Sequence, residues 1–194
     1  MQVPLVRRRM LQGLVLLLLW AGLLFSGAAR AQGIELSQLE TARRDGALTL
    51  EFAARITLPR AVEEALHGGV PVYFVAEAEL KRSRWYWRDE RVAHVVRTWR
   101  VAYQPLTATW RVGLGGLYQT YPSLPEAMAA VSRSAGWKIA DLAQIDGDSR
   151  YYLEFGFRLD TSQLPMPMQF GLGGPSEWSI GAERVLKLDG LERP

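Results

Sequence analysis

The segment Val70-Pro71-Val72-Tyr73-Phe74-Val75-Ala76-Glu77-Ala78-Glu79-Leu80-Lys81 alternates between apolar and polar side chains over most of its length. Its even-numbered residues are all apolar, and the polar residues occupy odd positions. Successive side chains of a strand point to opposite faces of a sheet, so this period of two predicts a half-buried β-strand. The segment therefore indicates a fold made of sheets that each turn one face toward a core.

The same alternation recurs along the chain. Even positions are apolar at residues 48–56, and the Arg44-Asp45-Gly46 that precedes them is typical of a tight turn after a partner strand at 34–42. Asp-Gly favours such a turn because both residues tolerate positive φ. Further strands are predicted at residues 92–103, 109–114, 117–121, 151–159 and 178–188.

Two short helices are expected between these strands. One covers residues 60–67 and stops at Gly68-Gly69. The other begins at the capping box Ser123-Leu124-Pro125-Glu126 and runs to about Ser134, before Gly136. Many antiparallel strands with few helices predict a mostly β protein, an antiparallel β-sandwich for which an immunoglobulin-like arrangement is one form.

The first 31 residues have the parts of a secretory signal peptide: Arg7-Arg8-Arg9, an apolar run at 11–25, and the small-x-small site Ala29-Arg30-Ala31. Cleavage is expected between Ala31 and Gln32, which leaves residues 32–194 as a single β-rich domain in the periplasm or outside the cell. The apolar run is shorter than the roughly twenty residues that span a bilayer comfortably. The alternative is an uncleaved N-terminal helix that anchors the protein in the inner membrane.

The leader also carries the excess of positive charge. The whole chain has 23 basic and 20 acidic residues, and residues 1–31 hold four arginines and no acidic residue. The remainder therefore has 19 basic and 20 acidic residues, a net charge of −1. Nucleic-acid binding proteins need a surplus of Lys and Arg to displace counterions from phosphates, so no nucleic-acid partner is expected.

The sequence contains no cysteine. This excludes disulfides, thiolate nucleophiles, cysteine-ligated zinc and the lipid attachment of a bacterial lipoprotein. The exported domain must therefore be stabilised by its hydrophobic core alone. Its length is sufficient for one such core.

Several motifs rich in aromatic residues and arginine follow one another along the chain. They are residues 72–80, Arg84-Trp85-Tyr86-Trp87-Arg88-Asp89, residues 97–107, Trp110-Arg111-Val112, Gly136-Trp137 and residues 159–165. In these motifs the chain resembles the DUF4390 family of uncharacterised proteobacterial exported proteins. The resemblance implies export and brings no catalytic residue with it. It also implies an association with a membrane sensor histidine kinase, because genes of this family often neighbour one.

The densest group of interface-type residues is Trp85, Tyr86, Trp87, Arg88 and Asp89. If these residues continue a strand, Trp85 and Trp87 share a face and belong to the core, Tyr86 and Arg88 face outward, and Asp89-Glu90 forms the turn. This structural interpretation is favoured. The alternative is a binding surface, whose aromatic faces stack on a partner and whose arginines pair with carboxylates.

A second candidate surface lies on the strand at 92–103, where Arg97, Trp99, Val101 and Tyr103 share one face, with Arg111 opposite. As an exposed ladder, it would suit an anionic envelope partner. The favoured interpretation is that the ladder seals the edge of the sandwich.

The candidates for catalysis are few. Glu77 and Glu79 point the same way about 7 Å apart, which suits glycoside hydrolysis but also describes any solvated strand face. His67 and His94 are too few for a histidine triad or a site with several histidines, so both are expected to be structural. Asp146-Gly147-Asp148-Ser149 lacks the further ligands of a calcium loop and is interpreted as a turn. The sequence predicts no catalytic residue, metal site or cofactor.

The expected function is therefore a periplasmic, non-enzymatic binding or accessory module that acts through protein–protein contact. An envelope protein, with a membrane sensor kinase as the first choice, is the expected partner. The alternatives are a glycan-acting enzyme that uses Glu77, Glu79 or Asp89, a glycan-binding domain, and a membrane-anchored spacer if the leader stays attached.

Overall fold

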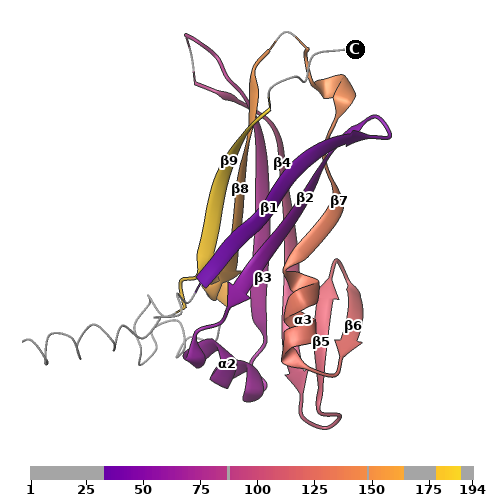
Figure 1. The fold of residues 1–194 in the computed structure, drawn as a ribbon, viewed down its shortest axis with the longest axis vertical. Helices are drawn as coiled ribbons and strands as arrows, with labels where there is room; N and C mark the ends of the chain where they lie inside the picture. Colours follow the sequence, from indigo (N-terminus) through magenta and orange to yellow (C-terminus); the bar gives the residue numbers. More distant parts are fainter. Residues whose placement is uncertain (1–32, 87, 148, 164–177, 189–194) are drawn as a thin grey trace, which may run out of the picture. The chain divides into compact units, whose positions relative to one another are not determined.

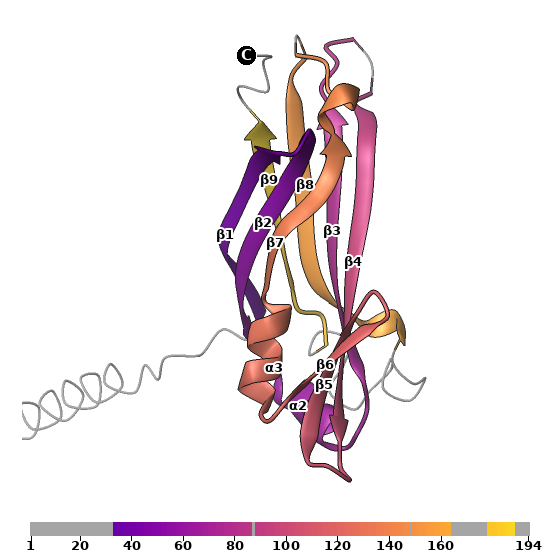
Figure 2. The same cartoon turned by 90° about the vertical axis from the view of Figure 1, so that its right-hand side faces the viewer.

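The computed structural model describes residues 33–86, 88–147, 149–163 and 178–188, all of which belong to one unit, Gln32–Pro194. These residues form two antiparallel sheets that face each other (Figures 1 and 2). The smaller sheet has the order β1 (Gly33–Arg44), β2 (Ala47–Thr57) and β7 (Arg133–Asp141). The mostly β, sandwich-like fold predicted from the alternation is confirmed.

The larger sheet contains six of the described strands, in the order β6-β5-β4-β3-β8-β9. Their bounds are β3 (Val72–Arg82), β4 (Glu90–Gln104), β5 (Thr109–Leu114), β6 (Leu117–Tyr121), β8 (Tyr151–Asp160) and β9 (Gly181–Leu188). An immunoglobulin constant-type domain divides its strands four and three, so the order seen here differs from that arrangement. The long hairpin β3–β4 lies at the centre of this sheet and ends in a loop at residues 83–89.

Aromatic side chains fill the space between the sheets. Phe52 on β2 packs against Phe155 and Phe157 on β8, with ring centroids 5.0 and 5.3 Å apart, and meets Trp99 on β4 edge-on at 6.1 Å. All four side chains are at most 3% exposed. The even-numbered residues of β3 face this core, which puts Glu77 and Glu79 on the outer face of the larger sheet, as the alternation predicts.

Most expected elements form close to their predicted bounds. Asp45 and Gly46 make the β1–β2 turn with φ of 51° and 72°. The first helix, α2 (Arg60–His67), has the predicted bounds. The second, α3 (Leu124–Val131), is capped by Ser123, whose hydroxyl oxygen accepts a bond from the Glu126 backbone. Two short 3-10 helices follow, η1 (Leu142–Gln144) and η2 (Thr161–Gln163).

Strand β7 is the main error of the sequence prediction. The helix was expected to run to about Ser134 and stop at Gly136, but it ends at Val131, and Gly136 lies inside β7. Gly136 has a φ of +61°, and the pairing of β2 with β7 shifts register beside it. The glycine therefore forms a β-bulge rather than a helix end. The last strand is also shorter than predicted, because it begins at Gly181 and not at Trp178.

The predicted leader at residues 1–31, with its cleavage site, lies outside the described residues. Within the described part of the chain, no helix is long and apolar enough to cross a membrane.

Candidate functional site

Ion pairs hold the base of the β3–β4 loop. The carboxylate of Glu90, the first residue of β4, pairs with the guanidinium groups of both Arg82 and Arg84. Asp89 accepts a hydrogen bond from the Arg84 backbone N–H at 3.1 Å and another from the Tyr152 hydroxyl of β8 at 2.5 Å. The loop is thus fixed at both of its ends and to the neighbouring strand.

At neutral pH, Asp89, Glu90 and Tyr152 are in the protonation states that the contacts at the loop base require. The hydrogen bond from Tyr152 and the backbone bond from Arg84 lower the pKa of Asp89. The bond to Asp89 in turn raises the pKa of the Tyr152 phenol to about 12. Hydrogen bonding to Arg82 lowers the pKa of Glu90. Both carboxylates are therefore ionised and the phenol keeps its proton, which the contacts at the loop base require.

Trp85 and Tyr86 project from this base into solvent. Their side chains are 93% and 69% exposed, and their rings meet edge to face with centroids 5.1 Å apart. The favoured interpretation of Trp85 as a core residue is therefore wrong. The predicted alternation does not extend this far, because β3 ends at Arg82 and residues 83–86, 88 and 89 have no strand structure. We call Trp85 and Tyr86 the aromatic tip.

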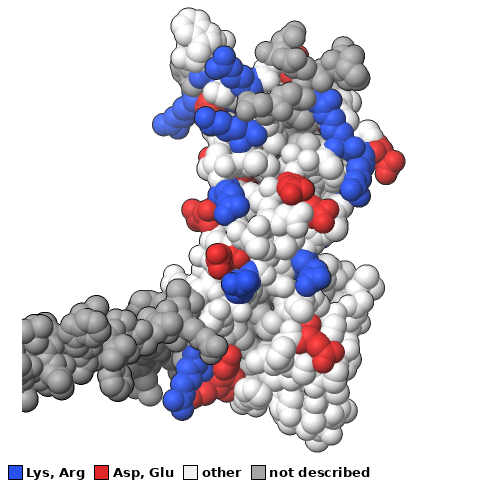
Figure 3. Space-filling model, in the orientation of Figure 1, with Lys and Arg blue, Asp and Glu red and all other residues white. Residues whose placement is uncertain are grey.

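The structure describes some of the other residues of the motif at 84–89. Arg88 is exposed and makes no hydrogen bond or ion pair within the part of the chain that the structure describes. Glu90 was expected to share the turn with Asp89 but is the first residue of β4. Trp87 lies outside the described residues. Figure 3 shows Lys and Arg side chains gathered near this loop, whereas basic and acidic side chains are interspersed over the middle of the same face.

In the second candidate surface, Trp99 is buried and Arg97 is half-buried. Trp99 is 3% exposed and packs on the phenylalanines of the core, so it cannot belong to an exposed ladder. The Arg97 guanidinium lies 4.9 Å from the centre of the Trp137 ring on β7 and donates to the Ser134 hydroxyl. Burial lowers the pKa of Arg97. These contacts join β4 to β7 across the two sheets, as expected of residues that seal the sandwich.

Arg111 does not face this ladder. It pairs in register with Ala102, on the opposite face of the larger sheet, and its guanidinium lies 4.0 Å from the centre of the Tyr118 ring. The Tyr118 ring also covers Gly113, where an added Cβ would lie 2.6 Å from the ring. This cluster stabilises the β5–β6 hairpin and is separate from Arg97.

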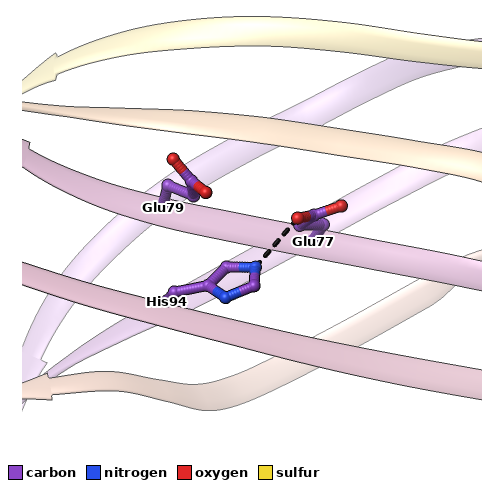
Figure 4. A group of neighbouring side chains, drawn as sticks. All are labelled: Glu77, Glu79 and His94. Carbon is purple, nitrogen blue, oxygen red and sulfur yellow. Dashed lines mark hydrogen bonds and ion pairs between the residues drawn. The ribbon is translucent and has the colours of Figure 1, made fainter. Parts of the chain in front are cut away.

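A second polar cluster lies on the outer face of β3, β4 and β8. Figure 4 shows Glu77, Glu79 and His94, and the Glu77 carboxylate is hydrogen-bonded to the His94 ring at 2.8 Å. Glu77 also pairs with Arg158 on β8 at 3.0 Å, and Glu79 pairs with Lys81 at 3.2 Å. His94, expected to be structural, thus forms part of a charged network.

The electrostatics of this cluster do not favour Glu77 as a general acid. A glycosidase needs one carboxylic acid with a raised pKa. The bonds from His94 and Arg158 instead lower the pKa of Glu77. The carboxylate is therefore a ready acceptor or cation ligand.

The matching family spans nearly all of the folded unit. A sequence model of the domain of unknown function DUF4390 matches residues 31–186. The chain belongs to the DUF4390 family. This assignment confirms the resemblance seen in the tryptophan and arginine motifs. No curated protein and no solved structure matches the DUF4390 chain, so the site has to be interpreted from its own geometry.

The sequence did not predict the residues that hold the base of the aromatic tip in place. Tyr152 contacts Asp89 from 63 positions along the chain. The alternation in residues 151–159 places Tyr152 on the outer face of its strand. It does not show that β8 pairs with β3, and this pairing brings Tyr152 to Asp89. The pairing of Arg82 with Glu90 was not predicted either, because both residues lie at strand ends, which are the least certain part of a sequence pattern.

Proposed function

We propose that this protein is an exported, non-enzymatic accessory module that docks on an envelope protein through the aromatic tip. The observation that carries the proposal is the 93% exposure of Trp85 on a loop whose base is fixed by ion pairs. Large aromatic side chains are costly to leave in water and are enriched where proteins bind one another. A fixed loop also loses little conformational entropy when it binds.

Charge around the tip suggests the chemistry of the partner. Arg88 is exposed on the same loop as Trp85 and has no ion pair among the described residues, and Arg84 pairs with Glu90 at the loop base. A partner that offers an apolar pocket rimmed with carboxylates would satisfy both the rings and the guanidinium. An envelope protein such as a membrane sensor kinase is our proposed partner, and export through the leader at residues 1–31 supports that location. The family match beginning at residue 31 is consistent with a leader that lies outside the folded domain.

Photocrosslinking tests this proposal. A photoreactive phenylalanine analogue placed at position 85 should crosslink in intact cells to one envelope protein, and Arg88→Ala should reduce the yield. Position 106 is the matched control, because Leu106 is also fully exposed in a hairpin turn, that between β4 and β5. Equal crosslinking from both positions would contradict docking through the tip. Crosslinking only to glycan would replace it with the glycan-binding alternative.

A further inference from the structure

The outer face of the larger sheet brings three possible metal ligands together. Glu79 on β3 pairs in register with His94 on β4, and Glu77 lies two residues along the same face. The ligand atoms of the three side chains lie within 4.8 Å of one another (Figure 4). We infer that Glu77, Glu79 and His94 bind a divalent transition-metal ion, for which Zn²⁺ is the best match.

The two carboxylates are already oriented by neighbouring cations. One oxygen of Glu77 accepts from Arg158 at 3.0 Å, and the other lies 2.8 Å from His94 Nε2. One oxygen of Glu79 lies 3.2 Å from Lys81 Nζ. The other oxygen of Glu79 forms an ion pair with Arg91 at 3.6 Å, which is longer than a hydrogen bond.

In each carboxylate one oxygen is therefore held by Arg158 or Lys81, while the other oxygen of Glu77 faces the His94 ring and the other oxygen of Glu79 has only the longer ion pair with Arg91 among the described residues. Partners of this kind fix the orientation of metal ligands. A bound ion would replace the hydrogen bond between Glu77 and His94 and would leave the contacts with Arg158 and Lys81 in place. The small movements required are side-chain rotations on a rigid pair of strands.

The donor set distinguishes among ions. Calcium and magnesium prefer sites made only of oxygen, whereas zinc accepts imidazole nitrogen together with carboxylate oxygen. Three protein ligands leave a fourth position of a tetrahedral ion open. A hollow of about 480 Å³ lies beside the carboxylates and is lined also by Glu154, Gly156 and Glu183. It leaves room for a water or an exchangeable ligand at that position.

The sequence alone predicts no metal site, because it does not place His94 beside Glu77 and Glu79. The metal-binding inference is independent of the docking proposal, because the cluster lies on the sheet face and shares no residue with the aromatic tip. Trp85→Ala should therefore leave metal binding unchanged. Failure of one proposal does not imply failure of the other.

Calorimetric titration of the purified, chelator-treated protein with Zn²⁺ is the test. We expect one saturable site of micromolar affinity, and binding more than about tenfold weaker in both His94→Ala and Glu79→Gln. His67→Ala is the matched control, because it removes the other histidine of the chain, which lies on α2. His67→Ala should bind as the parent does.

Resonances of the two imidazole rings give a second readout. Zn²⁺ should shift the ring signals of His94 and leave those of His67 in place, and excess Ca²⁺ or Mg²⁺ should not reverse the shift. Binding should weaken in acid, since protons compete with the ion for the ligands. Absence of saturable binding, or equal binding by His94→Ala, would overturn the inference and leave a cross-strand ion-pair network only.

Discussion

Trp85 and Trp99 lie on the same hairpin, yet one side chain is 93% exposed and the other is 3% exposed. The difference follows from where β3 ends. Residues 83–86 leave the sheet, so Trp85 has no facing layer, whereas Trp99 points into the core against Phe52 and Phe157. At the scale of single residues, exposure separates a side chain available for binding from one that stabilises the fold.

Substitution by alanine should show this difference in stability. Trp85→Ala should change the free energy of unfolding by less than about 0.5 kcal/mol, as is usual for surface positions. Trp99→Ala should lower it by about 3–5 kcal/mol, because a large cavity would open in the core. Urea unfolding followed by circular dichroism measures both. A large loss of stability for Trp85→Ala would return this residue to the core.

The contact between Tyr152 and Asp89 predicts an unusual titration. Its hydrogen bond raises the pKa of the Tyr152 phenol to about 12 from an ordinary 10.0, so the folded protein holds this proton where the unfolded chain releases it. The stabilisation from this contact is therefore complete below the ordinary pKa and is lost as pH rises toward 12. Asp89→Asn should bring the pKa back toward the ordinary value. Magnetic resonance of ring-labelled tyrosine, with Tyr152→Phe for assignment, would measure it, and an unchanged pKa in Asp89→Asn would contradict the contact.

At the scale of elements, strand patterns were predictable wherever one face is buried. The alternation located β3 and β8 because core residues repeat every second position along them. It failed at β7, where Gly136 interrupts the pattern with a bulge, and at the tip, where the pattern continues in sequence but not in structure. The Glu77, Glu79 and His94 cluster depends on the register between β3 and β4, which alternation alone does not determine.

The bulge in β7 gives a prediction for this element. Gly136→Ala should lower the free energy of unfolding by about 1–2 kcal/mol, because a side chain is strained at its φ of +61°. Gly156→Ala on β8 is the control, since its added Cβ would meet only the Glu183 side chain at 3.8 Å, an ordinary contact. Urea unfolding compares the two. Equal effects would mean that the backbone at Gly136 is not strained.

At the scale of the whole molecule, we propose that the sandwich is exported and docks through the aromatic tip. The export part predicts that the mature protein begins at Gln32. Sequencing the N-terminus of protein isolated from the periplasm should find this residue first. A chain that keeps its leader and fractionates with membranes would support the anchored spacer instead.

The central claim is that the aromatic tip docks on an envelope partner. Chemical crosslinking in intact cells, with the yield of the crosslinked complex compared among the parent protein, Trp85→Ala and Leu106→Ala, tests it most directly. The account predicts that Trp85→Ala reduces the yield more than about tenfold at unchanged cellular level, because truncating a central aromatic residue costs more than about 1.4 kcal/mol of binding. Leu106→Ala should match the parent. Equal yields from all three proteins would contradict the claim.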